Sequence, residues 1–237
     1  MTNKYTVKPH DLNSDANAQF FIMERFLNSK SFIMLGIVTA VKQGKDNEMS
    51  FVDLKPLVTD QSAQGEILDS GTIYNAPVWR LQRGGSAVIM DPVVGDIGLM
   101  AICDKDIRTA VDSRKQSLPA SGRNHSPGDA IYLGGVLNNS PSQYLRFMDD
   151  GIDLVSPLVV NIDSPVITAN ASESFVVNSP SITLNGPVSQ GAGSNKGDFT
   201  FAGNITATGE VTGKGIKLST HTHGGVQSGN SDTQGPK

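Results

Sequence analysis

Residues 156–170 read Ser-Pro-Leu-Val-Val-Asn-Ile-Asp-Ser-Pro-Val-Ile-Thr-Ala-Asn, and this stretch decides the fold of the C-terminal part of the chain. Short β-branched runs alternate with two Ser-Pro turns that are eight residues apart; Ser172 continues the spacing, and Ser179–Pro180 follows one residue early. Such a turn-punctuated repeat predicts a β-solenoid or an intertwined β-prism, in which each pass buries few side chains. A disordered tail would contain fewer Val and Ile residues and would show no alternation.

A single chain of this kind cannot bury its own inner face, because each strand offers few apolar side chains on one side. Three chains wound about one axis can do so, and the sequence therefore predicts a trimer with a narrow core. The candidates for that core are Val160, Ile162, Val177, Ile182 and Leu184. The intervening Asn, Ser and Thr residues would face water. A two-sheet sandwich built from the same strands is the alternative.

The composition of the chain changes at Met148. The one Trp, all four Tyr, all seven Met, the one Cys and every Arg lie at or before this residue. Gly, Ser, Thr, Asn, Val and Ile dominate after it, and the Phe, Tyr and Trp positions there are Phe175, Phe199 and Phe201. A compact domain of the second composition would lack the bulky side chains that fill a globular interior. The change therefore separates a conventional domain from a thin, repetitive one.

The part before Met148 begins with a helical pattern and continues with strands. Apolar residues between positions 12 and 27 follow a helical spacing, with Asp11 or Asn13 as the cap, and this arm is expected to pack on the next domain or on a neighbouring subunit. Between residues 32 and 136 the pattern is strand and turn, which suits a small Greek-key barrel of OB type. The main strand runs are residues 32–41, 49–58, 73–78 and 95–102, and Gly84–Gly85 is expected to be a hairpin turn.

Charge and length exclude several classes of function. The chain has 237 residues and a formal net charge of −4, so it offers no broad basic surface for nucleic acid or for an anionic membrane. The sequence shows no apolar signal core and no apolar stretch long enough to span a bilayer, which predicts a protein made soluble in the cytoplasm. Cys103 has no partner within the chain and is expected to be a small buried hydrophobic residue rather than a reactive thiol.

Three segments of the chain resemble one known family. Residues 92–107 and 123–135 resemble the N-terminal OB-fold domain of phage membrane-puncturing central spike proteins, and residues 220–226 resemble the tip of the same proteins. The order of barrel, β-prism and His-x-His is more specific than any one motif, and the resemblance covers most of the chain after residue 30. It implies that the barrel attaches to the hub protein of the tail baseplate, that the prism is a three-chain β-helix, and that the tip binds iron.

The tip also has a chemistry that follows from its residues. His221 and His223 are two positions apart, so in an extended strand both imidazoles point to the same face. On a threefold axis the two positions would supply six nitrogens, an octahedral set that suits a divalent first-row metal. Zinc in a tetrahedral site would use four of the six nitrogens and leave two without a metal, so the set favours iron. The expected stoichiometry is one ion per trimer. The alternative is a mobile His pair on a polar surface tail.

These patterns together predict an all-β protein with four parts. The parts are a helical arm (1–30), an OB-fold domain (31–140), a trimeric β-helix (141–218) and a metal-binding apex (219–237). The predicted function is structural: a spike at the tip of a contractile phage tail, or of a related injection system, that pierces the host outer membrane. Its expected partners are two further copies of the chain, the baseplate hub and that membrane. No nucleic acid and no small-molecule substrate are expected. Further ions can bind along the threefold axis.

No catalytic motif is found in the sequence, and the protein is expected not to be an enzyme. Two alternatives differ in class. A trimeric receptor-binding fibre or adhesin would be expected to carry exposed aromatic residues near its end, whereas this tip has small and polar residues. A metalloenzyme that uses His221 and His223 would be expected to hold the pair inside a barrel. We therefore expect a virion protein of the tail baseplate tip that is assembled in the host cytoplasm.

Overall fold

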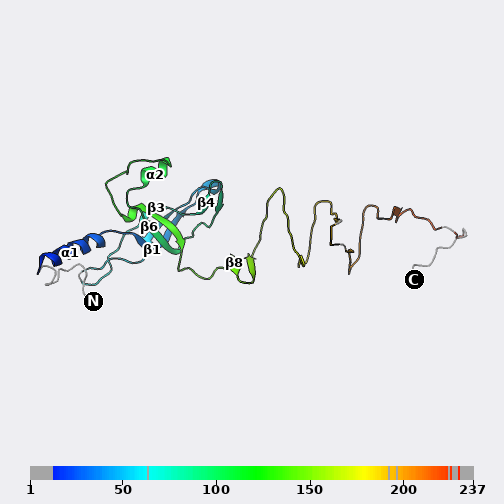
Figure 1. Cartoon of the computed structure of the whole chain (residues 1–237), viewed down its shortest axis with the longest axis horizontal. Coiled ribbons are helices and arrows are strands. Elements are labelled where there is room, and N and C mark those ends of the chain that lie inside the picture. Colours follow the sequence, from blue (N-terminus) through cyan, green and yellow to red (C-terminus); the bar gives the residue numbers. More distant parts are fainter. Residues whose placement is uncertain are drawn as a thin grey trace. The chain divides into compact units, whose positions relative to one another are not determined.

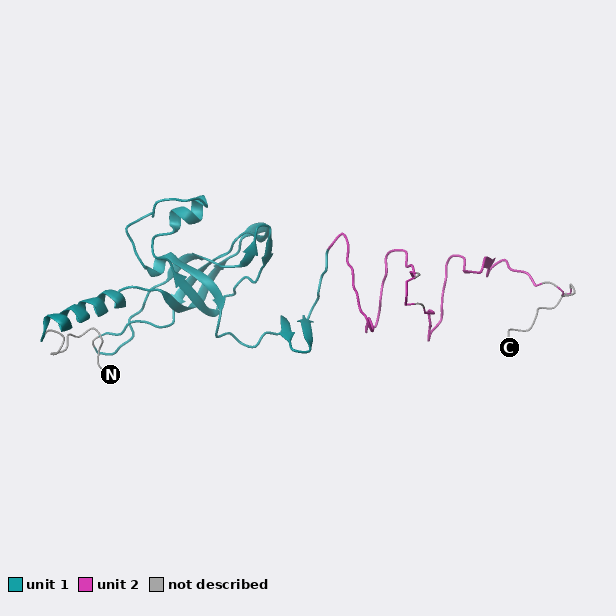
Figure 2. Cartoon of the chain, in the orientation of Figure 1, with its two compact units in different colours: residues 1–163 teal, residues 164–237 magenta. Residues whose placement is uncertain are grey.

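The computed structural model describes residues 13–62, 64–191, 193–195 and 197–223, together with 225 and 229. The chain forms two compact units, residues 1–163 and 164–237, which Figure 2 shows in teal and magenta. The first unit contains helices α1 and α2 and a curled five-stranded sheet (Figure 1). The predicted all-β fold with a short N-terminal helix is therefore confirmed.

Helix α1, Asp15–Asn28, begins after Ser14, whose side-chain oxygen accepts a hydrogen bond from the backbone N–H of Asn17 at 3.2 Å. Ser14 is thus the cap, and the prediction of Asn13 was wrong by one residue; Asp11 lies outside the described residues. No residue of α1 is buried, although the helix carries several large apolar side chains. The expectation that this arm packs on another subunit stays a prediction.

Five strands form the main sheet, in the order β3-β2-β1-β6-β7, and every neighbouring pair is antiparallel. The strands are β1 (Ile33–Lys42), β2 (Phe51–Pro56), β3 (Ile73–Pro77), β6 (Ile97–Ile102) and β7 (Ala130–Gly135). The register shifts within the β1–β2, β2–β3 and β6–β7 pairs, and such irregularities bend a sheet. A parallel bridge between Val78, directly after β3, and Tyr132 in β7 joins the two outer strands.

The hydrophobic core lies inside this curl. Along β6 the residues Gly98, Met100 and Ile102 are buried while their neighbours are partly exposed, as expected for a strand with one face on a core. The largest fully buried apolar side chains are Tyr132, Leu54, Met100, Val38 and Val52. A Cβ atom at Gly98 would lie 2.2 Å from the backbone oxygen of Gly134, so glycine at this position allows β6 and β7 to approach closely.

Two hairpins and three short helical segments complete the first unit. Strands β4 (Leu81–Arg83) and β5 (Ser86–Val88) pair across the predicted turn at Gly84–Gly85. Strands β8 (Tyr144–Met148) and β9 (Gly151–Val155) pair across a turn at residues 149–150. The short helical segments are η1 (Lys45–Asn47), α2 (Arg108–Ser113) and η2 (Pro127–Asp129).

An ion-pair cluster with buried carboxylates and a partly exposed arginine lies within the long connection between β6 and β7. The Arg123 guanidinium lies 2.9 Å from the carboxylate of Asp106 and 2.9 Å from that of Asp129. Both carboxylates are buried, and the Ser121 hydroxyl donates a second hydrogen bond to Asp106 at 2.7 Å. Because a buried carboxylate needs a cation and hydrogen-bond donors, this cluster ties the two ends of the segment 106–129 together.

Between residues 156 and 211 the described part of the chain forms no helix or strand. It bends at several places, among them two Ser-Pro pairs, where the Ser164 hydroxyl donates to the Val166 carbonyl and the Ser179 hydroxyl donates to the Ser181 carbonyl. Every described residue from 157 to 211 is exposed, and Leu158 reaches 91%. Because the strands of an intertwined prism pair between chains, one chain cannot test that arrangement, and the predicted trimeric β-helix stays a prediction.

Candidate metal-binding apex

The apex is built on a short hairpin of strands β10 (Thr212–Gly213) and β11 (Ile216–Lys217). The turn residues Lys214 and Gly215 have φ angles of 51° and 81°. Positive φ at both central residues is the type I′ pattern, which matches the right-handed twist of a two-residue hairpin. The Leu218 N–H donates to the Val211 carbonyl at 2.9 Å and so extends the pairing by one step.

Glu210 closes the open end of this hairpin. Its carboxylate accepts a hydrogen bond from the backbone N–H of Ser219 at 3.2 Å and a second one from the Ser219 hydroxyl. The hydroxyl hydrogen bond is the main reason why the pKa of Glu210 lies below its usual range, and the backbone N–H of Ser219 adds to the effect. The ionised carboxylate is thus the form that holds the hairpin closed.

The first predicted ligand, His221, hydrogen-bonds back to this hairpin. Its Nδ1 atom lies 2.8 Å from the Leu218 carbonyl oxygen. A carbonyl can only accept, so Nδ1 carries the proton, and in the neutral ring Nε2 keeps its lone pair. The imidazole also lines a shallow cavity of about 330 Å³ together with Val211, Gly213, Ile216 and Leu218.

The structure brings the two predicted ligands together. The ring centroids of His221 and His223 are 5.0 Å apart and their planes meet at 77°. Both side chains are exposed, so each has room for a ligand from another chain. Metal-bound His residues usually donate their second ring N–H to a carbonyl or a carboxylate, and His221 already makes that contact. The residues present therefore fit a metal, although two imidazoles from one chain do not complete a site.

Other candidate residues have no such arrangement. Within the described residues, no group of three or more His, Cys, Asp and Glu side chains could hold a metal ion. The His125 ring lies 4.9 Å from the Phe32 ring, and its backbone has a positive φ of 50°, which fits a residue in a structural turn. Cys103 is half-buried, and burial raises the pKa of its thiol, as expected for an unreactive cysteine. His10 lies outside the described residues.

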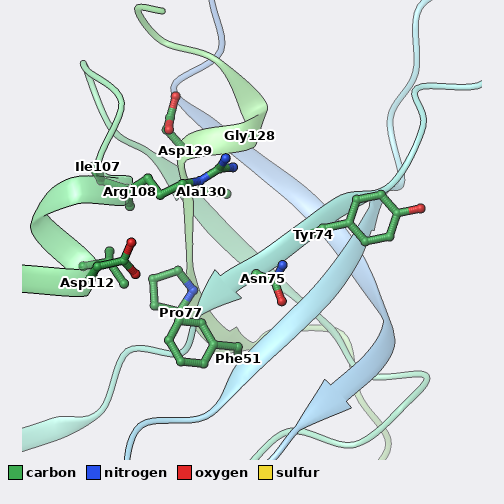
Figure 3. A pocket seen from close by; sticks show the side chains of 11 residues that line it. Phe51, Tyr74, Asn75, Pro77, Ile107, Arg108, Asp112, Gly128, Asp129 and Ala130 are labelled. Atoms are coloured by element: carbon green, nitrogen blue, oxygen red, sulfur yellow. The ribbon is translucent and has the colours of Figure 1, made fainter. Parts of the chain in front are cut away.

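A separate cavity of about 470 Å³ lies between α2 and strand β3 (Figure 3). Polar side chains reach it from both sides: Tyr74 and Asn75 from β3, Arg108 and Asp112 from α2. This cavity could not be predicted from the sequence, because the helix α2 on one side of it was not predicted.

The comparison with known proteins identifies the apex rather than the sheet. Residues 215–237 match a family model described as the GpV Apex motif. The match contains β11 and both His residues, and its last part extends beyond the described residues. No curated protein matches the chain.

Strand β11 and the His pair thus belong to a segment that is similar to the apex of a phage tail spike. The similarity to the GpV apex supports a phage baseplate spike protein of that type, a structural component of the virion at the tip of the tail. Among the described residues, no helix is both long enough and apolar enough to cross a lipid bilayer.

Proposed function

We propose that this chain is the trimeric membrane-puncturing spike of a contractile phage tail or of a related injection system, which pierces the host outer membrane when the sheath contracts. The observation that carries the proposal is the apex match over residues 215–237, which contains β11 and the neighbouring rings of the His pair. A narrow and chemically inert point would concentrate the force of contraction on a small area. Such a role needs stiffness and no catalytic group.

Exposed apolar side chains support the trimer. In the single chain the five predicted core residues of the prism, Val160, Ile162, Val177, Ile182 and Leu184, are all exposed, as are Leu158 and Phe175. Soluble proteins rarely leave so many large apolar side chains in water. Two further copies of the same chain are the partners that the eight-residue repeat would fit, because identical repeats stay in register along a common axis.

The five-stranded sheet supports an attachment domain of OB type. Its order β3-β2-β1-β6-β7 and the parallel bridge from Val78 to Tyr132 are what a small Greek-key barrel would need, and they support this proposal. In this proposal the barrel binds the baseplate hub protein, and the prism carries the apex away from it. The exposed helix α1 adds apolar surface for that attachment or for a neighbouring subunit.

The His pair supports a structural metal, for which iron is our proposal. His221 and His223 of three chains would complete one six-coordinate shell, so the stoichiometry would be one ion per trimer. When bound, such an ion would supply a cross-link between the three chains. The residues of this chain hold one imidazole by its Nδ1 and leave both rings accessible.

Mass measurement and elemental analysis of the purified protein test the assembly. We expect a trimer that contains one metal ion, and a stable monomer would contradict the proposal. One ion per chain would indicate separate sites and would favour the metalloenzyme.

Phage particles test the role. Particles whose spike lacks residues 215–237 should adsorb to the host normally but should fail to make its outer membrane permeable. Loss of adsorption itself would instead identify a receptor-binding fibre.

A further inference from the structure

The peptide bond between Leu218 and Ser219 is held from both of its sides. On one side, the Ser219 N–H donates to the Glu210 Oε1 atom at 3.2 Å. On the other side, the Leu218 carbonyl lies 2.8 Å from Nδ1 of His221. In a trans peptide the N–H and C=O groups point in opposite directions within one plane. Glu210 and His221 therefore contact the same rigid unit from opposite edges.

This peptide plane has little freedom to rotate. The Leu218 N–H is fixed to the Val211 carbonyl at 2.9 Å, and the Ser219 hydroxyl gives Glu210 a second hydrogen bond. Each bond restrains a torsion next to the peptide. A rotation that turned the Leu218 carbonyl away from the imidazole would break the contact between the Ser219 N–H and Glu210. The direction of the carbonyl is thus set by the carboxylate behind it.

We propose that Glu210 is a positioning residue for the metal ligand His221, acting through the Leu218–Ser219 peptide. The negative carboxylate polarises the peptide, and the polarised carbonyl holds the proton of the imidazole on Nδ1. The lone pair then stays on Nε2, where it is available to a metal. A carboxylate that contacts a metal-bound histidine directly fixes the tautomer and orientation of its ring. Here Glu210 would have the same effect on His221 through the peptide. This inference rests on the proposed role of His221 as a ligand.

Sequence comparison does not reveal this residue. The segment that matches the GpV Apex motif begins at residue 215, and Glu210 precedes it. The hairpin turn at Lys214 and Gly215 brings the carboxylate back to the matched segment. The matched motif is therefore completed by a residue outside its own bounds.

Glu210→Ala and Glu210→Gln in the full-length protein test the inference, with Glu173→Gln as the matched control on an exposed carboxylate outside the hairpin. Imidazole nitrogen NMR of the metal-free protein, assigned with His221→Ala, should show the proton of His221 on Nδ1 in the wild type. In Glu210→Ala the Nε2-protonated form should appear. Glu210→Gln, which keeps an acceptor but loses the charge, should lie between the two, and Glu173→Gln should match the wild type.

Titration with Fe²⁺ is the second measurement, and Glu210→Ala should bind about 10–100-fold more weakly than the wild type. Light scattering of each variant confirms that the trimer is intact, and Ser219→Ala serves as a milder variant that leaves the backbone N–H in place. An unchanged His221 tautomer in Glu210→Ala would overturn the inference. If the wild type bound no metal, the proposed metal site would fail, while the tautomer would still decide whether Glu210 acts on His221.

Discussion

Val78 and Tyr132 form a parallel bridge, and through it the outer strands of the five-stranded sheet meet. The Trp79 N–H strengthens the junction by donating to the Tyr132 carbonyl at 2.8 Å. Tyr132 also fills the core, because its side chain is among the largest that are fully buried. The backbone of Tyr132 thus joins the outer strands, and its ring occupies the core.

The Tyr132 side chain allows these contributions to be separated. Tyr132→Ala should destabilise the sheet by about 3–5 kcal/mol, the usual cost of removing a buried aromatic ring. Tyr132→Phe should be neutral or stabilising, because the Tyr132 hydroxyl is buried and finds no hydrogen-bond partner among the described residues. Urea unfolding followed by the fluorescence of Trp79, the one tryptophan, measures both changes. A large loss of stability in Tyr132→Phe would reveal a partner for the hydroxyl.

Removal of Arg123 should be more damaging than removal of an exposed ion pair. Arg123→Met leaves the buried carboxylates of Asp106 and Asp129 without their shared cation, which should cost about 3–5 kcal/mol. Lys55→Met breaks the exposed pair with Asp69 and should cost far less, because water screens this pair. The same fluorescence assay compares the two variants. Equal costs would mean that the cluster does not anchor residues 106–129.

The Asp106 carboxyl should make stability depend on pH. Its pKa is lowered mainly by the hydrogen bond from the Ser121 hydroxyl, and the Arg108 N–H and the Arg123 charge add to the effect. Because the folded state favours the ionised form, this stabilisation is complete above the ordinary pKa of an aspartate and is lost as the pH falls through the lower folded value. When the pH is lowered, the sheet of Asp106→Asn should therefore lose less stability than that of the wild type. A parallel acid profile in both proteins would contradict this prediction.

The predicted prism core should be sensitive to charge on one face of its strand. Ile182→Asp combined with Leu184→Asp would place six carboxylates at the centre of a trimer, so the variant should dissociate. Thr183→Asp is the control, because it lies between the two and faces the opposite side of an extended strand. Light scattering distinguishes the two outcomes. A trimer that tolerates the double change would place these side chains outside the core.

Loss of both imidazoles should remove the metal and leave the trimer. In His221→Ala combined with His223→Ala, the apolar side chains that are predicted to join the chains are unchanged, so we expect loosening of the apex alone. Elemental analysis measures the metal, and His10→Ala should retain it. Acid should also release the ion from the wild type, because a protonated imidazole is not a ligand. Metal retained by the double variant would exclude the His pair as its site.

Strands β1, β2, β3 and β6 overlap the predicted runs, because each is rich in apolar residues and follows or precedes turn residues. The alternating burial of β6 could not be predicted, because every residue from Ile97 to Ile102 is apolar or glycine. The six-residue helix α2 was missed because little more than one turn gives no periodicity to detect. The strands expected after residue 156 would pair between chains in the proposed trimer, and they stay a prediction.

The apex shows the same limit for a functional site. The pair His221 and His223 was predictable, since residue type and a spacing of two are properties of the sequence. The contact of His221 with the Leu218 carbonyl and the contact of Glu210 with Ser219 were not predicted. Both depend on the turn at Lys214, whose positive φ a lysine adopts without any sequence signal. Side-chain chemistry was therefore easier to predict than the backbone that orients it.

The hairpin of the apex also bears on the order of assembly. Its longest described hydrogen-bonded link, between Glu210 and Ser219, joins residues nine positions apart. Contacts this local can form within about 1–10 μs, long before separate chains meet by diffusion. Each subunit would then arrive with a finished tip. In the proposed trimer, three such tips would set the starting register of the eight-residue repeat, so that the chains would not pair one repeat out of step.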